Sequence, residues 1–175
     1  YEGSVVYLAD PRCMADPGKA FKENPHKKLV IDLVHEGVGP IYGHVGKPDD
    51  GNDFARAHYE QHMKVSGTIA IEGEPRIDIR GHGLRDHSWG PRYWQAPWYY
   101  RWLTANVDEN FGFMASRVAK RDSPGTRGGF VWENGTIHLC DDVEITTDTR
   151  GDENYHDRIE GVIRSSRSER EWRFT

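Results

Sequence analysis

One short stretch of the sequence concentrates the residue types that carry out acid–base chemistry. It spans residues 81–102 and is built around Gly-Leu-Arg-Asp-His-Ser-Trp-Gly at residues 83–90. Four of the six tryptophans of the chain lie in it. Adjacent Asp86 and His87 add a carboxyl group and an imidazole, so the stretch supplies the converging polar groups and the apolar walls that a binding pocket requires. We therefore expect the functional centre of the chain here.

Asp86 and His87 are the expected catalytic pair, because a positioned carboxyl group and an imidazole can exchange protons with a substrate near neutral pH. The residues expected to bind the substrate are their basic and aromatic neighbours, namely Arg85, Trp89, Arg92, Trp94, Tyr99, Trp102 and His82. Gly81, Gly83 and Gly90 predict sharp changes of chain direction or close backbone approach around them.

A purely structural role for the same stretch is the competing interpretation. Asp86 would then pair with Arg85 or Arg92 and tie a bulge to the next strand, while the tryptophans would form an ordinary core. The density of charges favours function. Arg-Asp-His in succession places charges on both faces of a strand, and burying charges costs free energy unless they are paired or used.

Other kinds of site find less support in the sequence. His82 and His87 are five residues apart, so their rings would point to opposite faces of a strand, and no third metal ligand follows at a recognisable spacing. Ser88 adjoins His87, but the chain has no Gly-x-Ser-x-Gly nucleophile elbow. The Gly81-x-Gly83 pattern does not extend to a dinucleotide fingerprint. We expect neither a metal nor a cofactor.

The elements that position this stretch are predicted to be β-strands, because apolar residues alternate with a period of two. Residues 59–71 and 77–80, joined by the turn Glu72-Gly73-Glu74, predict a hairpin that leads into the stretch. Asn134-Gly135 predicts a tight turn between two later strands. The other predicted strands cover residues 28–36, 98–107, 111–119, 128–133, 136–140, 142–147, 157–164 and 171–175.

The domain organisation is predicted from the segments that resist a strand assignment. Residues 10–25 predict a long loop with a helical turn near residues 19–22, and residues 43–53 are rich in Gly, Pro and Asp. We expect residues 1–45 to close a first β unit, residues 46–57 to form a linker, and residues 58–175 to form most of a second β domain. The chain begins at Tyr1 and stops at Thr175 within an alternating segment, which predicts a fragment of a longer protein.

Charge and composition narrow the partners and the compartment. The net charge is −5 with both signs interspersed, so no basic stripe is available for nucleic acid. No apolar run approaches the roughly 20 residues that span a bilayer, and the N-terminus lacks the order of a signal peptide. The two cysteines, Cys13 and Cys140, do not suggest a disulfide framework. We expect a soluble cytoplasmic protein whose open strand edges favour pairing between copies.

The motifs quoted above resemble a known superfamily. Tyr59-Glu60-Gln61-His62, residues 65–69 (Val-Ser-Gly-Thr-Ile) and residues 81–90 are similar to the lipocalin-like hydratases and isomerases, a superfamily that includes carotenoid 1,2-hydratases and kievitone hydratase-like proteins. The resemblance implies two consecutive lipocalin-like domains, with the Asp-His-x-Trp-Gly segment facing a cavity early in the second. The fold it implies is all-β, an antiparallel lipocalin-like (calycin-type) barrel or strongly curved sheet, left incomplete because the first domain is mostly absent.

The resemblance and the acid–base residues together predict a cofactor-independent hydratase or isomerase. Its substrate would be an apolar molecule with a carbon–carbon double bond, such as a terpenoid, a polyketide or a lipid. Asp86, protonated beside Trp89, would donate a proton and His87 would accept one from water, or the two roles are exchanged because Arg85 and Arg92 favour the ionised carboxylate. Aromatic faces in the stretch would stabilise a cationic carbon.

Two alternatives from other classes stay open. The chain could be a non-catalytic binding protein that holds a small apolar ligand in a β-barrel. It could also be an interaction domain whose tryptophan-rich surface, including Trp94 and Trp98, meets a partner. An enzyme requires Asp86 and His87 to reach one shared cavity, whereas a carrier requires an apolar cavity with few ionisable groups.

Overall fold

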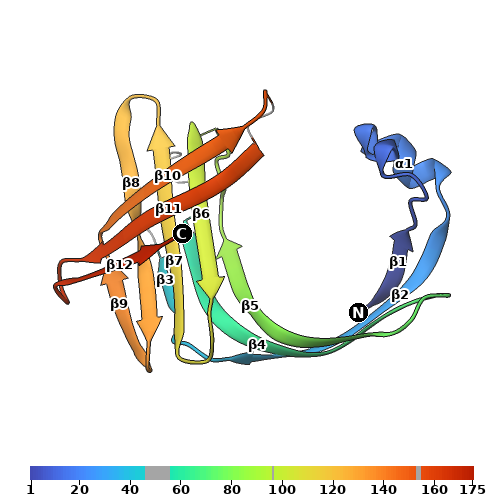
Figure 1. Ribbon diagram of the computed structural model, residues 1–175, viewed down its shortest axis with the longest axis horizontal. Coiled ribbons are helices and arrows are strands. Elements are labelled where there is room, and N and C mark those ends of the chain that lie inside the picture. Colours follow the sequence, from blue (N-terminus) through green and yellow to red (C-terminus); the bar gives the residue numbers. More distant parts are fainter. Residues whose placement is uncertain (46–55, 96, 153–154) are drawn as a thin grey trace. The chain divides into compact units, whose positions relative to one another are not determined.

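The computed structural model describes residues 1–45, 56–95, 97–152 and 155–175 (Figure 1). The fold is mostly β: three antiparallel sheets are accompanied by one short α-helix, which confirms the predicted class in its coarser form. The elements, in chain order, are β1 (Glu2–Val6), the 3-10 helix η1 (Pro11–Ala15), α1 (Pro17–Glu23), β2 (His26–Gly37), β3 (Tyr42–Val45), β4 (Ala57–Ile71), β5 (Ile77–Trp89), β6 (Tyr99–Asn106), β7 (Phe111–Lys120), β8 (Ser123–Glu133), β9 (Thr136–Cys140), β10 (Asp142–Arg150), β11 (Tyr155–Ser165) and β12 (Arg170–Phe174).

Strand β5 differs from its prediction, because it continues unbroken through Gly81 and Gly83. Neither glycine is a turn. Alternation of side chains therefore holds along the Asp86 region, and the strand ends at Trp89, directly before Gly90, where φ is +90°. A glycine is suited to that conformation, which L side chains rarely adopt. The predicted Asn134-Gly135 turn is present, with both residues at positive φ between β8 and β9.

The chain forms two compact units, and β4 and β5 contribute to both. The first consists of residues 1–36 and 64–81, and the second of residues 37–63 and 82–175. This division falls inside two strands. The sequence instead predicted units at residues 1–45 and 58–175 with a linker at 46–57, of which residues 46–55 lie outside the described residues.

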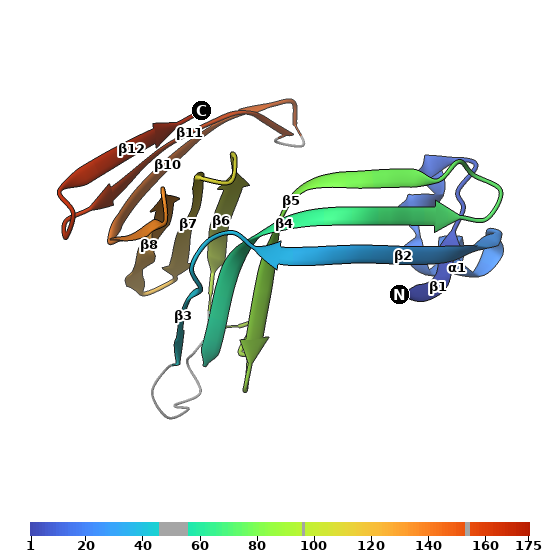
Figure 2. The ribbon, with the colours of Figure 1, turned by 90° about the horizontal axis from the view of Figure 1, so that it is seen from below.

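In the first unit, β1 pairs with β2, β2 with β4, and β4 with β5 (Figure 2). Close pairing depends on Gly67, where a Cβ atom would lie 2.1 Å from the carbonyl oxygen of Asp32. Helix α1 begins at Pro17, and Asp16 caps it by accepting a hydrogen bond from the backbone N–H of Lys19. None of the described helices has the length and apolar character needed to cross a membrane.

The second unit is built on the sheet β6-β7-β8-β9, whose two faces carry two separate apolar clusters. On one face, Phe113, Ala115 and Val131 pack against Val143 and Ile163 of the β10-β11-β12 sheet, whose strands cross the first sheet in Figure 1. Side chains alternate along a strand, so the residues between these point to the opposite face. The sheet is therefore apolar on both sides.

The opposite face of the same sheet packs against β3 and β4. Phe130 on β8 is only 1% exposed, and its ring lies 4.8 Å from the ring of Tyr42 on β3 and 5.4 Å from that of His62 on β4. Met114 and Trp132 complete this cluster. The contacts orient one face of β4 toward the β6–β9 sheet, and this face carries the polar groups of the candidate site.

The closed barrel that the resemblance implies is not formed by the described strands, which make three sheets instead. The physical reason lies in the β6–β9 sheet. A sheet with apolar side chains on both faces needs a layer on each side, since an apolar face is stable only when other elements cover it. Strands β10–β12 cover one face, and strands β3 and β4 pack on the other.

We expect Phe130→Ala to lower the free energy of unfolding by about 3–5 kcal/mol, since truncating a fully buried aromatic side chain leaves a cavity. The matched control is Val107→Ala, at a side chain that is 61% exposed, where the change should stay within about 0.5 kcal/mol. Denaturant unfolding followed by tryptophan fluorescence measures both. Equal losses in the two variants would show that Phe130 is not part of a packed layer.

Candidate functional site

A polar cluster lies between β4, β5 and β6 of the second unit, and His58 on β4 is its centre. Its Nε2 atom lies 2.8 Å from Oε1 of Glu60. Its Nδ1 atom lies 2.8 Å from Oγ of Ser88 and 3.3 Å from Oδ1 of Asp86, both on β5. Positions two apart on a strand share a face, so His58 and Glu60 project together from β4, as do Asp86 and Ser88 from β5.

The carboxylate of Glu60 is the most deeply buried charged group of the cluster, with a side chain only 1% exposed. Its Oε1 atom accepts hydrogen bonds from His58 and, at 3.0 Å, from the indole Nε1–H of Trp102 on β6. Its Oε2 atom is buried and has no hydrogen-bond partner among the described residues. A buried carboxylate is costly unless it is paired, so the arrangement favours a positive charge on His58.

The pKa of His58 is raised above its ordinary value, chiefly by the hydrogen bond to Glu60. Burial of the ring opposes this rise, while the negative charges of Glu60 and Asp86 reinforce it and the charge of Arg92 counters it. The two ring nitrogens therefore differ in role. Nε2 is held against buried Glu60, whereas Nδ1 is directed toward Asp86, whose side chain is 51% exposed. A proton on Nδ1 is the one that can be exchanged.

A second histidine, His62, lies one further step along the same face of β4 and is 1% exposed. Its Nε2 atom lies 3.2 Å from Oγ1 of Thr104, whose hydroxyl donates to the carbonyl of Phe113. Because the hydroxyl proton of Thr104 is used in that bond, its oxygen accepts a hydrogen bond from Nε2–H of His62. Gly112 makes room for the ring, since a Cβ atom there would lie 2.3 Å from Nδ1. Burial lowers the pKa of His62, so Glu60 separates two histidines whose pKa values shift in opposite directions.

The structure does not bring Asp86 and His87 together, because neighbouring residues of a strand point to opposite faces. Asp86 joins the His58 cluster. His87 packs on the other face, where its ring lies 5.4 Å from the rings of Tyr59 and Trp89. Arg85 shares that face, with its guanidinium 5.1 Å from the ring of Tyr59. The predicted pair is thus divided between the His58 cluster and an aromatic surface.

Three other predicted residues either bond to the cluster or change the pKa of one of its histidines. Trp102 belongs to it through the bond to Glu60, and the rest of its side chain is partly exposed. Arg92 lies close enough for its charge to lower the pKa of His58, and His82 has the same effect on His62. These two are electrostatic neighbours of the histidines.

The remaining predicted residues lie on an exposed aromatic surface. Trp94 is 60% exposed, and the guanidinium of Arg92 stacks 4.8 Å from the centre of its ring. Trp98 is 61% exposed and contacts the ring of Tyr99 edge-on at 5.5 Å.

Three residues of the cluster are not among the site residues predicted from the sequence: His58, Glu60 and Ser88. A signal was present, because His58, Glu60 and His62 occupy alternate positions of one strand, β4. Polar residues at a period of two on an inward face mark a buried polar cluster, since each must find a partner there.

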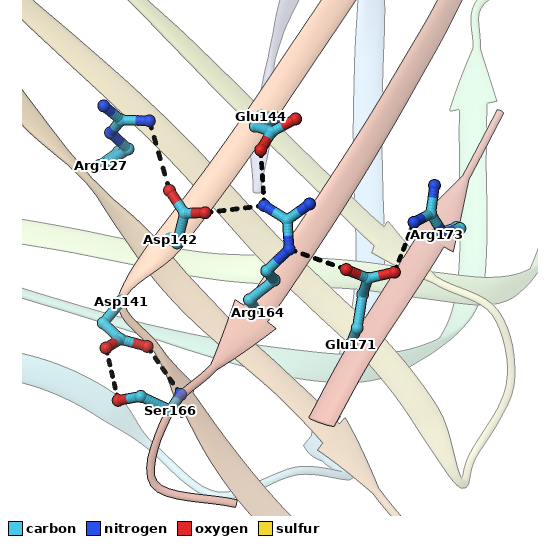
Figure 3. A network of polar contacts seen from close by, with 8 residues as sticks. All are labelled: Arg127, Asp141, Asp142, Glu144, Arg164, Ser166, Glu171 and Arg173. Carbon is cyan, nitrogen blue, oxygen red and sulfur yellow. Dashed lines mark hydrogen bonds and ion pairs between the residues drawn. The ribbon is translucent and has the colours of Figure 1, made fainter. Parts of the chain in front are cut away.

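A second polar network holds the β10-β11-β12 sheet together (Figure 3). Arg164 on β11 reaches Asp142 at 2.8 Å and Glu144 at 2.6 Å on β10, and Glu171 at 2.7 Å on β12. These bonds raise the pKa of Arg164. Two open hollows of ≈ 400 Å³ on this sheet are lined largely by such charged side chains. The network is solvent-accessible and joins three neighbouring strands, so we assign it to cross-strand stabilisation.

Metal binding gains no support from the geometry, since the described residues contain no group of three His, Cys, Asp or Glu placed to hold an ion. The chemistry that a cluster such as that of His58 can perform is proton transfer, with Nε2 of His58 held against Glu60 and Nδ1 facing Ser88 and Asp86.

We expect His58 to titrate above the ordinary histidine value of 6.5 and His62 below it, measured by NMR titration of the ring resonances. Glu60→Gln should lower the pKa of both rings, because it removes a negative charge that favours their protonated forms. Since folded His58 binds its proton more tightly than the unfolded chain, its contribution to stability is complete below pH 6.5 and is lost as pH rises through the folded-state pKa.

Glu144→Gln is the matched control for this titration, because Glu144 pairs with Arg164 and not with a histidine. This variant should leave the pKa values of His58 and His62 unchanged. A His58 titration that does not move in Glu60→Gln would rule out the buried carboxylate as its partner.

Comparison with known families gives one match. Residues 8–175 match the model of a domain of unknown function (DUF7064). Neither the curated proteins nor the solved structures yield a match. The family match covers nearly the whole chain, including every residue of the His58 cluster, and the chain belongs to the DUF7064 family.

Proposed function

We propose that this protein is a cofactor-independent hydratase or isomerase that acts on a carbon–carbon double bond of an apolar substrate, with His58 and Asp86 moving the proton. One observation supports this above the others: His58 is anchored through Nε2 to buried Glu60 and presents Nδ1 to half-exposed Asp86. The same orientation of an imidazole by a buried carboxylate is used in general acid–base catalysis.

The roles follow from burial. Glu60 fixes the orientation of the ring and stabilises its charged form, so His58 carries a proton that Nδ1 can deliver to a substrate carbon. Asp86, on the solvent side, accepts a proton either from an attacking water or from the adjacent substrate carbon. The first route adds water across the double bond, and the second shifts the double bond. In both, the proton given by His58 is balanced by the proton taken by Asp86.

The acid strength of the His58 imidazolium limits which double bonds it can protonate. An imidazolium is a weak acid, with an ordinary pKa near 6.5. It is poorly matched to an isolated alkene, whose protonation leaves a bare cationic carbon. A double bond conjugated to a carbonyl group fits better, because protonation or deprotonation at the neighbouring carbon is then stabilised by the carbonyl oxygen. The indole of Trp102, 38% exposed beside Glu60, offers an apolar surface for the rest of the molecule.

The resemblance to the lipocalin-like hydratases and isomerases supports the same reaction class, since Asp86 lies in the Arg-Asp-His-Ser-Trp-Gly segment that carries it. Under this proposal His87 and Trp89 belong to a binding surface on the opposite face of β5, and His58 takes the base-or-acid role that the sequence suggested for His87.

An interaction domain is the second candidate, favoured by the exposure of Trp94 and Trp98. Exposed aromatic side chains in one segment are typical of protein interfaces. We expect partners retained by such a domain to be lost in the double variant Trp94→Ser, Trp98→Ser and kept in Glu60→Gln. Affinity purification of each form with mass spectrometry makes the comparison. Partners kept by the double variant would remove this candidate.

The enzymatic proposal is tested by assaying terpenoid, polyketide and lipid enones for hydration or double-bond migration. His58→Gln and Asp86→Asn should each lower kcat/KM by about 10²-fold or more, the usual contribution of a general acid or base. His87→Gln should lower it only several-fold, because the ring lies on the other face of β5. Chromatography with mass detection follows substrate and product.

The pH dependence gives a second check on the same assay. Activity that requires the imidazolium of His58 should fall as pH rises through the raised pKa of that ring. Turnover that survives unchanged in both His58→Gln and Asp86→Asn would end the proposal. A loss of activity in His87→Gln alone would also end the proposal, because it would show that the reaction takes place on the aromatic face of β5.

A further inference from the structure

We propose that Ser88, His58 and Glu60 form a nucleophile, base and acid triad, and that Ser88 accepts acyl groups from esters of apolar acids. This activity is distinct from the proton transfer proposed above and does not depend on it. The triad joins two strands, with the serine on β5 and the histidine and carboxylate on β4.

The distances match the requirements of an activated serine. Ser88 Oγ lies 2.8 Å from Nδ1 of His58, and Nε2 of the same ring lies 2.8 Å from Oε1 of Glu60. A nucleophile within hydrogen-bond reach of a base, which is oriented in turn by a third group, is the general signature of covalent catalysis. Triads are recognised by this geometry and not by their order in the sequence. Here Nδ1 faces the serine and Nε2 faces the carboxylate, whereas in the Ser-His-Asp triad Nε2 faces the serine and Nδ1 the carboxylate.

Burial supports the role of the acid. Glu60 is 1% exposed and is held by the indole N–H of Trp102, while its second oxygen, Oε2, has no hydrogen-bond partner within the described residues. The carboxylate is therefore fixed in place and has unused acceptor capacity. When His58 takes the serine proton, the ring becomes an imidazolium against this carboxylate, and low local dielectric strengthens their attraction.

The protonation state of His58 decides which partner Nδ1 engages. In the imidazolium, Nδ1–H donates toward Asp86 at 3.3 Å and toward Ser88 at 2.8 Å. In the neutral ring, Nε2–H stays on Glu60 and Nδ1 becomes an acceptor for the Ser88 hydroxyl. The charged groups that face His58 are Glu60 on β4, Asp86 on β5 and Arg92 after β5. Only the neutral ring can activate the serine.

The reaction is balanced without any further reagent except water. Ser88 Oγ bonds to the ester carbonyl carbon, its proton passes to Nδ1 of His58, and the alcohol leaves with that proton as the original ester bond breaks. Water then attacks the acyl-serine, giving its proton to His58, and the acid is released as Oγ recovers a proton. The exposed part of Trp102 beside Glu60 favours esters with apolar or aromatic acyl groups.

A fluorophosphonate probe tests the triad directly, since it forms a stable bond with an activated serine. We expect one equivalent of probe on Ser88, located by peptide mass spectrometry. Labelling should increase with pH as His58 becomes neutral, opposite to the pH dependence of the proposed proton-transfer activity. His58→Gln should slow labelling about 10²-fold or more, and Glu60→Gln should slow it to a smaller extent.

Ser116→Ala is the matched control, because Ser116 is a partly buried serine of the same unit that donates to the carbonyl of Gly128. It should label at the rate of the unchanged protein, whereas Ser88→Ala should not label. Circular dichroism checks that each variant is folded. A variant that fails to fold does not weaken the test, because the pH profile is measured on the unchanged protein.

Two results would overturn the triad. One is no labelling of Ser88 at any pH, and the other is a labelling rate that depends neither on pH nor on the presence of His58. Hydrolysis of p-nitrophenyl butyrate and hexanoate adds a turnover measurement, which should disappear in Ser88→Ala. Failure of the triad is distinguishable from failure of the proposed function, since the enone assay requires His58 and Asp86 but no covalent bond to Ser88.

Discussion

The structure around the candidate site depends on how one buried carboxylate is satisfied. Glu60 is almost fully enclosed, and a charge in that position persists only with partners that compensate for lost water. The Nε2–H of His58 and the indole N–H of Trp102 both donate to the same oxygen. The bond from His58 ties Glu60 to the group that faces β5, and the bond from Trp102 ties β4 to β6. One buried carboxylate thus links β4 to β6 and raises the pKa of the His58 ring.

The same constraint explains why two histidines on one face of β4 behave differently. His58 is bonded to Glu60 and retains a partly exposed edge, so its charged form is favoured. His62 lies against Phe130 and is bonded to a hydroxyl, so burial favours its neutral form. The same strand face therefore holds one ring whose pKa is raised and one whose pKa is lowered. Gly112 makes room for the second ring, since a side chain there would collide with the His62 ring.

Most of the fold could be predicted from local patterns, and the errors have a physical cause. Period-two alternation located the strands, and Asn134-Gly135 located a hairpin turn, because both signals depend only on neighbouring residues. Of the two roles predicted for Gly81 and Gly83, a change of direction or a close backbone approach, the turn is absent, since a glycine permits a turn without requiring one. The layered arrangement, in place of a closed barrel, follows from long-range packing on both faces of the β6–β9 sheet.

The sequence by itself determined that most of the chain forms β-strands, because period-two alternation depends only on neighbouring residues. It also determined that acid–base residues and aromatic residues gather between residues 81 and 102. That Asp86 and His87 lie on opposite faces was decided by the structure, in which β5 continues unbroken through both. Only the tertiary structure decided that Ser88 meets a histidine 30 residues earlier and that Trp102 meets a carboxylate 42 residues earlier. Strand pairing and sheet packing join such distant positions, and neither is encoded in the spacing of nearby residues.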